Sequence, residues 1–496
     1  MDISQRITNP EQLTTHGNRD PRRDMVEIME AGLRAADPYN NTKALFKLEG
    51  NLLTVGDERF VPTDSPYPVT QQIDLDEVDR IFVVGAGKGI QRLARAIEDA
   101  LGDRLTGGVV IEKHGGGPTI CERVEVVYGA HPVPDENCVE GCRKILALSR
   151  GLTERDLVFT VVANGVSSLL TLPVEGLTLD DVRQVTQAMQ IDRGVPTFDL
   201  NPVRNHLDQM KGGRMSRHMR PARLIHIVAY QPFPWSFYTS DNIWLHSLPE
   251  ASTFATAMEM LERWDAVEAM PAKVLAFLKA ADPAQETVKP DEFMNWKSPV
   301  YGVMPKYSEL GMLPTARRKA EELGYNVLIL STWLQAEAGS AAQVISSVAL
   351  SIERHGLPIE PPACLINGGE LLVTVGGQNG MGGRDQEWAV SAAITIDGSP
   401  NIVMGSVDTD GTDGPGHQFN TDSQDVPVLG GGIVDGQTAE AARRRGIDLR
   451  DAQKRHDTSP ALWALDCGVQ VSHNISITDL TVALITERGV NPNWTR

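Results

Sequence analysis

Short apolar runs that alternate with amphipathic stretches mark the first half of the chain. Residues 81–84 (IFVV) form such a run, which ends at Gly85. The apolar positions after it recur at helical spacing, at Ile90, Leu93, Ala94, Ile97 and Leu101. Since strands and helices bury side chains with different periods, we expect a strand, a glycine loop and a helix in this order.

Further apolar runs are rich in β-branched residues, are bounded by turn residues, and are mostly separated by amphipathic stretches of helix length. They lie at 109–111, 124–127, 157–162, 224–229 and 327–330. This alternation predicts an α/β fold whose first domain is a Rossmann-like, mostly parallel sheet wrapped by helices.

The pattern changes twice in the second half. Residues 281–306 are rich in proline and polar residues and show neither period, so we expect a loop or insertion there. After residue 363 the segments ACLING, LLVTV, a helix beginning near Gln386, and NIVMG follow closely, with glycine clusters between them. This predicts a smaller C-terminal α/β domain with the active-site cleft between the two domains. The expected organisation is a flexible tail at 1–24, a Rossmann-like domain at 25–280, an insertion and connecting segment at 281–362, and the C-terminal domain at 363–496.

Composition narrows the classes of partner. The formal charge of −19 disfavours nucleic acid, because it repels a phosphate backbone. No apolar stretch approaches the roughly 20 residues that span a bilayer. The polar N-terminus and five scattered cysteines favour a cytoplasmic protein with reduced thiols. Since anion binding against this charge needs local cations, lysines and arginines in glycine loops are the first candidates for contacting a small anionic metabolite.

The loop Gly85-Ala86-Gly87-Lys88-Gly89 places a lysine at the end of the first predicted strand, where open α/β sheets bind ligands. It lacks the third glycine of a dinucleotide fingerprint, and no clear acidic residue follows a second strand about 20 residues on, which disfavours hydride transfer. The alternative is that Gly85 and Gly87 only form a tight turn.

Lys211-Gly212-Gly213-Arg214 is a second cationic glycine loop, with Arg204 and His206 just upstream on a predicted helix. A guanidinium binds a carboxylate through two parallel hydrogen bonds, and a lysine adds a mobile charge. The grouping suits recognition of a carboxylate or phosphate, unless it is only a solvated helix end.

The C-terminal domain repeats this arrangement at Gly382-Gly383-Arg384-Asp385-Gln386-Glu387, where Glu387 could also be an ordinary partner of the helix dipole. Asp408, Asp410 and Asp413 then crowd a glycine-rich turn. Such carboxylates either bind Mg²⁺ or cap backbone amides. In the first domain, His131 lies in a proline-rich loop and is either an acid or base or a packed structural residue.

An ordered set of loops resembles the two-domain glycerate 2-kinase family over about residues 25–485. The set consists of GAGKG (85–89), GAHPVPDE (129–136), LPVEGLTLDD (172–181), VRNHLDQMKGGRM (203–215), GGELLVTV (368–375), GGRDQE (382–387) and TDGTDGP (409–415). Three segments depart from the family pattern. The glycine-rich SGGGSALL becomes ANGVSSLL at 163–170, and the segments at 226–244 and 471–480 are replaced.

The resemblance implies ATP- and Mg²⁺-dependent phosphorylation of a hydroxyl group of a small hydroxy acid such as glycerate. Lys88 and Arg384 would face each other across the cleft as catalytic residues. The substrate side would use Lys211, Arg214, Arg204, His206, His131 and Glu387. The cofactor side would use Gly85, Gly87, Asn164, Ser167 and Ser168. The metal ligands would be Asp410 and Asp413.

Two alternatives remain open at the level of sequence. One is a lyase, isomerase or hydrolase that acts on a hydroxy or keto acid, since the cationic loops remain while the glycine-rich loops are altered. The other is a catalytically silent sensor or assembly partner. No GxSxG, HExxH, Walker or CxxC motif is present, which disfavours serine hydrolysis, zinc hydrolysis and P-loop chemistry. The exact substrate and any homo-oligomeric state stay open.

Overall fold

The computed structural model describes residues 5–305, 311–375, 380–414, 425–475 and 478–491, and the chain divides into two compact units. The central unit is Pro38–Pro305. The terminal unit combines the two ends of the chain, residues 1–37 and 306–496.

A six-stranded parallel sheet in the order β6-β5-β4-β7-β8-β9 forms the core of the central unit. Its strands are β4 (Arg80–Ala86), β5 (Gly107–Lys113), β6 (Val124–Gly129), β7 (Asp156–Val162), β8 (Arg223–Val228) and β9 (Val300–Gly302). This confirms the predicted parallel sheet. A small antiparallel sheet joins it, made of β1 (Phe46–Glu49), β2 (Leu52–Val55) and β3 (Gln71–Asp74).

The strand order reverses between β4 and β7. From β4 the chain adds β5 and β6 on one side, and then returns to add β7, β8 and β9 on the other. β7 is buried along its whole length, as its mostly apolar sequence favours when helices cover both faces of a sheet. The loops that leave β4 and β7 therefore meet at a topological switch point, where open α/β sheets bind ligands.

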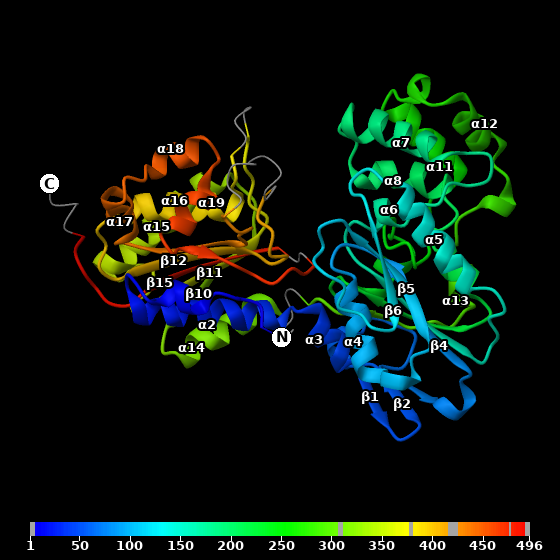
Figure 1. The fold of residues 1–496 in the computed structure, drawn as a ribbon, viewed down its shortest axis with the longest axis horizontal. Helices are drawn as coiled ribbons and strands as arrows, with labels where there is room; N and C mark the ends of the chain where they lie inside the picture. Colours follow the sequence, from blue (N-terminus) through cyan, green and yellow to red (C-terminus); the bar gives the residue numbers. More distant parts are fainter. Residues whose placement is uncertain (1–4, 306–310, 376–379, 415–424, 476–477, 492–496) are drawn as a thin grey trace. The chain divides into compact units, whose positions relative to one another are not determined.

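Helices complete the central unit (Figure 1). They are α3 (Pro38–Ala44), α4 (Gln91–Leu101), α5 (Glu136–Leu148), α6 (Val166–Leu169), α7 (Leu179–Thr186), α8 (Thr197–His206), α9 (Arg214–Met219), α10 (Trp235–Thr239), α11 (Phe254–Arg263), α12 (Ala272–Ala280) and α13 (Pro290–Met294). α8 packs against α11, and together with α12 and the segment after α7 they enclose a separate apolar core. The segment at 281–306, expected to be a loop, contains α13 and β9.

The terminal unit has a mixed sheet in the order β10-β11-β15-β12-β13-β14, in which β10 and β11 are parallel and the other pairs antiparallel. Its strands are β10 (Asn326–Leu334), β11 (Ala363–Gly369), β12 (Ile402–Asp408), β13 (Gly431–Asp435), β14 (Gly468–Val469) and β15 (Asp479–Ile485). The second α/β sheet is thereby confirmed.

Two layers of helices cover this sheet, with α2 and α14 on one face and α15 and α16 on the other (Figure 1). The helices of the unit are α1 (Pro10–Thr14), α2 (Arg19–Ala35), α14 (Met312–Glu322), α15 (Ala338–His355), α16 (Arg384–Thr395), α17 (Thr438–Arg444), α18 (Leu449–Lys454) and α19 (Thr458–Ala464). Among the helices of the described ranges, none is long and apolar enough to cross a membrane.

The compact units differ from the expected domain boundaries at two places. Residues expected in a flexible tail are packed, with Ile7 and Leu13 buried and Arg22 paired with Asp435 at 2.6 Å. The expected insertion contributes α14, β10 and α15 to the terminal unit. Periodicity reports local structure and cannot show that the two ends of a chain share one core.

The segment LLVTV (371–375) forms no regular strand, because only Leu372 within it makes a β-bridge, an isolated one to Glu337. The amide of Leu371 instead donates to Asp479 Oδ2 at 2.7 Å, and that of Leu372 to the carbonyl of Ala336 at 2.9 Å. A side-chain carboxylate therefore takes a backbone bond that a strand would have used.

Candidate functional site

Close packing accounts for two glycines at the switch point. A Cβ atom on Gly85 would lie 1.7 Å from the carbonyl oxygen of Val161. Gly87 has a φ of +151°, and a Cβ there would lie 2.7 Å from the nitrogen of Ala163. Both positions thus need glycine for the approach of β4 and its loop to β7. A cofactor contact through Gly85 or Gly87 stays a prediction.

An internal carboxylate occupies the amide end of the first glycine loop. Glu112 Oε1, fully buried, accepts hydrogen bonds from the amides of Gly89 at 2.7 Å and Lys113 at 2.9 Å. Burial raises the pKa of Glu112 to about 7, although these amides oppose the shift. Glu112 thereby takes up an amide just before the start of α4, where a phosphate would otherwise bind.

Lys88 and His131 lie beside each other in the central unit. A Cβ on Gly165 would lie 3.0 Å from Lys88 Cγ and 3.2 Å from His131 Cδ2, so the two side chains meet over this glycine. Burial, Lys88 and Lys113 lower the pKa of His131 to about 4. His131 is therefore neutral near pH 7. Asn164 joins this loop through its carbonyl oxygen, which accepts from the Lys88 amide at 2.7 Å.

Ser167 contacts Asn201 and His246, two polar residues that sequence reasoning missed. Its Oγ lies 2.8 Å from His246 Nε2 and accepts from Asn201 Nδ2 at 3.2 Å. Burial, followed by the nearby Lys211 charge, lowers the pKa of His246 well below its usual value, so the imidazole is neutral. Neither Asn201 nor His246 lies in a recognisable motif. Ser168 differs, since its hydroxyl donates to the carbonyl of Ala130 at 3.0 Å.

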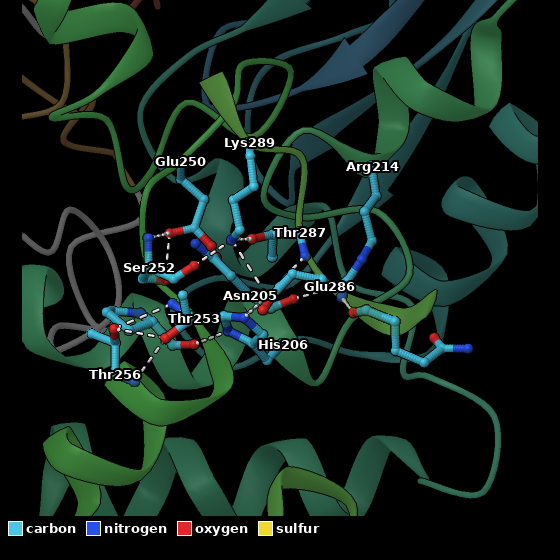
Figure 2. A network of polar contacts seen from close by, with 12 residues as sticks. Asn205, His206, Arg214, Glu250, Ser252, Thr253, Thr256, Glu286, Thr287 and Lys289 are labelled. Atoms are coloured by element: carbon cyan, nitrogen blue, oxygen red, sulfur yellow. Dashed lines mark hydrogen bonds and ion pairs between the residues drawn. The ribbon is translucent and has the colours of Figure 1, made fainter. Parts of the chain in front are cut away.

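Lys211 and Arg214 are held by contacts within their own chain. Lys211 Nζ donates to Asp208 Oδ2 at 2.6 Å and to Thr171 Oγ1 at 2.9 Å, and the pair is buried. Arg214 donates to backbone carbonyls, including that of Asn205 at 2.6 Å (Figure 2). These contacts favour a structural role, and substrate binding by Lys211 or Arg214 stays a prediction.

His206 also belongs to an internal network, shown in Figure 2. Its Nδ1 faces the carbonyl of Pro202 at 2.7 Å, and its Nε2 faces Glu286 Oε1 at 2.5 Å. Since both ring nitrogens face oxygens, the ring donates at both positions when it is protonated. Despite partial burial, His206 and then Lys289 lower the pKa of Glu286 to about 2. The network ties α8 to the segment before α13.

Arg204 differs from these residues because it is buried without an acidic partner. Its side chain is 6% exposed, and Nη2 donates to Gln190 Oε1 at 3.0 Å. Within the described part of the chain no carboxylate lies within ion-pair distance, and Nε has no hydrogen-bond partner. Burial lowers the pKa of Arg204 to about 10, so the group stays charged near neutral pH. A buried cation of this kind favours an anionic ligand.

In the terminal unit, α16 begins at the ends of three strands. Asp408 ends β12 and pairs in register with Asp479, the first residue of β15. Arg384, the first residue of α16, lies 2.8 Å from Asp479, 3.0 Å from Asp408 and 3.2 Å from Glu370. Arg384 is therefore clamped by carboxylates.

Three buried aspartates form a candidate metal centre. Asp385, Asp408 and Asp479 each offer an oxygen within 4.8 Å of the other two. Within the described residues, Asp385 Oδ2 has no hydrogen-bond partner. Burial and the neighbouring carboxylates raise the pKa of Asp385 above its usual value. Because Arg384 supplies one positive charge against these carboxylates, a hard divalent cation such as Mg²⁺ fits the residues present.

The predicted metal ligands have capping contacts instead. Asp410 Oδ1 accepts from the Thr412 amide at 2.8 Å. Asp413 Oδ2 accepts from the Gln386 amide at 2.8 Å, inside the first turn of α16. These contacts match the capping alternative, and metal binding by Asp410 or Asp413 stays a prediction. The aspartates that do converge include Asp385 and Asp479, which sequence reasoning did not assign to metal because their strand and helix ends meet only in the fold.

Glu387 pairs with His456 through Nδ1. Burial raises the pKa of Glu387, and His456 opposes that shift. Substrate binding by Glu387 therefore stays a prediction, as does a meeting of Lys88 with Arg384, since the two lie in different units.

Two family models and several known proteins match this chain. The family model described as "Domain of unknown function (DUF4147)" matches residues 24–230, and the "MOFRL family" model matches residues 363–479. The chain is 35% identical over 387 residues to "D-glycerate 2-kinase" of Thermotoga maritima, covering 78% of this chain and 85% of the relative. It is 31% identical over 450 residues to "Glycerate 2-kinase" of Pyrococcus horikoshii, covering 88% and 92%. The crystal structure of "Glycerate kinase" from Thermotoga maritima has a TM-score of 0.70 at 28% identity, covering 94% of this chain and 99% of that one.

Proposed function

The chain belongs to the glycerate 2-kinase family, and from this premise we propose that it transfers a phosphoryl group from ATP to a hydroxyl group of a small hydroxy acid such as glycerate. The observation that carries the proposal is the presence of two sites with opposite charge. One is the buried guanidinium of Arg204, with Lys88 nearby in the same unit, and the other is the aspartate cluster beside Arg384.

The central unit supplies groups for the acid. Arg204 and Lys88 carry positive charge that complements a carboxylate or a transferring phosphoryl group. His131 and His246 are neutral near pH 7, so they hydrogen-bond without adding charge. A loose phosphoryl-transfer transition state requires positioning more than a strong base, and fixed neutral side chains meet that requirement.

The terminal unit supplies groups for the metal. Asp385, Asp408 and Asp479 would hold Mg²⁺, which neutralises charge on nucleotide phosphates when bound. Arg384 is fixed by Asp408 and Asp479, so its guanidinium is oriented before any ligand arrives. We retain Arg384 and Lys88 as the proposed catalytic residues, and a cytoplasmic location and homo-oligomeric state stay predictions.

The test is ADP release measured with glycerate and related hydroxy acids in the presence of Mg²⁺. We expect turnover with at least one acid and none after exhaustive EDTA treatment. Absence of turnover with every acid, together with absence of ATP binding by calorimetry, would overturn the proposal.

A non-kinase reaction on the same acid is the alternative, and one observation favours it. Glu112 fills the amide end of the first glycine loop, where a nucleotide phosphate would otherwise bind. Saturable ATP binding by the full chain would decide against this alternative.

A further inference from the structure

Three buried polar atoms without partners lie along α8. They belong to Asn201, Arg204 and Asn205, which are 0%, 6% and 0% exposed. Within the described residues, Asn201 Oδ1, Arg204 Nε and Asn205 Oδ1 make no hydrogen bond. Positions i, i+3 and i+4 share one helix face, so these three side chains leave the helix in similar directions. We call them the α8 triad.

We propose that the α8 triad is the recognition site for a small polyhydroxy acid, with Arg204 on the carboxylate and the two asparagine oxygens on hydroxyl groups. The proposal rests on the proposed function and deepens it, since it assigns the residues that distinguish a hydroxylated acid from a plain one.

Anchored amides fix the direction of both asparagine oxygens. Asn201 Nδ2 donates to the carbonyl of Ile243 at 3.2 Å and to Ser167 Oγ at 3.2 Å. Asn205 Nδ2 donates to the same Ile243 carbonyl at 3.1 Å. Turning either amide around would place its oxygen against that carbonyl. Each Oδ1 is therefore left as an acceptor that requires a donor, and a hydroxyl group of a ligand supplies one.

Ser167 and His246 hold Asn201 in place. Because Asn201 donates to Ser167 Oγ, the serine proton is free to point at His246 Nε2, 2.8 Å away. His246 is neutral, and its Nε2 accepts this bond in the tautomer that carries the proton on Nδ1. Ser167 and His246 are thus positioning residues for the triad.

Charge around the triad selects an acid. Arg204 is close enough to His131, His246 and Lys211 for its charge to lower each of their pKa values. Lys211 is neutralised by Asp208, whereas Arg204 has no carboxylate partner in the described ranges. Nε is a directional donor on a guanidinium that Gln190 fixes, which suits a carboxylate oxygen. One charge and two hydroxyl acceptors match an acid with two hydroxyl groups better than a phosphate.

The test is calorimetric binding of acids to the full wild-type chain without nucleotide. Glycerate has two hydroxyl groups, lactate and 3-hydroxypropionate have one each, and propionate has none. Each missing hydroxyl leaves a buried acceptor unpaired, so we expect roughly tenfold weaker binding per hydroxyl removed. Equal affinity for glycerate and propionate, or no binding of any acid, would overturn the proposal.

Variants assign the individual contacts. We expect Arg204→Met to weaken binding of all four acids at least about tenfold. Asn205→Leu should leave propionate binding within a few-fold of wild type and remove the preference for one of the two single-hydroxyl acids. The matched control is Arg143→Met, an exposed arginine of α5. Unchanged acid preference in a folded Asn205→Leu protein would count against the assignment of Asn205 Oδ1 to a ligand hydroxyl group. The wild-type acid series tests the proposal even if a variant does not fold.

Binding and turnover separate this proposal from the kinase proposal. Graded acid binding without ADP release would retain the triad and reject the kinase. ADP release at equal rates with glycerate and with lactate, each at limiting concentration, together with equal affinities for the two acids, would retain the kinase and reject the triad.

Discussion

At the scale of single residues, the internal partner of each cation or acid decides what that side chain remains able to do. Lys211, Arg214 and His206 are satisfied by Asp208, by backbone carbonyls and by Glu286. Arg204 is as buried as they are and has no acidic partner among the described residues. Sequence places all four in one motif, and their contacts separate them.

Lys88→Met and Arg384→Met should differ in stability although both should lose most activity. Lys88 is half-buried in a loop, so its loss should leave the unfolding temperature near that of wild type. Loss of Arg384 leaves buried carboxylates uncompensated and should cost about 3–5 kcal/mol. Thermal melting and steady-state kinetics measure both effects. Lys144→Met, which removes an exposed cation from α5, is the control. Equal stability of the two variants would contradict the clamped role of Arg384.

Glu112→Gln should change how stability depends on pH. The folded pKa of Glu112 is about 7 against an ordinary 4.5, so the native state holds a proton that the unfolded state loses. Wild-type stability should therefore fall as pH rises from about 4.5 to 7, by up to about 3 kcal/mol from this group. Denaturant unfolding at a series of pH values should show this slope reduced in the variant. Glu125→Gln, at an exposed position of β6, should keep the wild-type slope. A wild-type slope of stability against pH in Glu112→Gln would contradict the raised pKa of Glu112.

At the scale of elements, helix and strand ends carry the chemistry. β4 and β7 end at the loops that hold Lys88 and Asn164, and the strand order reverses between them. In the terminal unit, β12 ends and β15 begins at the paired aspartates Asp408 and Asp479. Regular structure fixes these ends by backbone bonding, and so their side chains are held in place.

Glu286→Gln should loosen the attachment of α8 to the segment before α13. The carboxyl pKa is lowered to about 2, so the contribution of the Glu286–His206 pair is present above about pH 4.5 and lost as pH falls toward 2. Because Glu286 is a quarter exposed, we expect a cost of about 1 kcal/mol near neutral pH. Hydrogen exchange should speed up at 281–289 and at the end of α8. Glu259→Gln on α11 is an exposed control. Unchanged exchange at 281–289 would show that the pair does not anchor the segment.

At the scale of the whole molecule, each unit holds its own set of charged side chains, and the two sets differ in sign. The central unit presents Lys88 and Arg204, whereas the terminal unit concentrates Asp385, Asp408 and Asp479. The chain as a whole carries −19, so local charge must govern the binding of an anion. Metal and acid should therefore stabilise different units.

Mg²⁺ should raise the unfolding temperature through the aspartate cluster. Asp408→Asn should abolish most of this increase, because it removes a ligand charge and keeps the shape. The metal-free variant should be at least as stable as metal-free wild type, since one buried repulsion is gone. Asp410→Asn is the matched control and should respond to Mg²⁺ like wild type, because its capping contact needs only an oxygen acceptor. If Mg²⁺ raised the unfolding temperature of Asp408→Asn as in wild type but not that of Asp410→Asn, the result would favour Asp410 as a metal ligand.

Local sequence determined much of this protein, including the parallel sheet, the second α/β sheet and the loops that carry Lys88 and Arg384. These follow from periodicity and from glycine and cation placement, which act over a few residues. The resemblance carried by those loops identified the family, which the relatives confirm.

Tertiary structure alone decided the rest. Residues 5–37 and the chain after 310 share one core, although hundreds of residues separate them. Glu112 takes the amide end of the first glycine loop, and Asp385, Asp408 and Asp479 converge at the ends of α16, β12 and β15. Asn201 and His246 meet at Ser167 from different segments. Burial, charge compensation and hydrogen-bond satisfaction depend on residues distant in sequence, and a local pattern contains no information about which of them will meet.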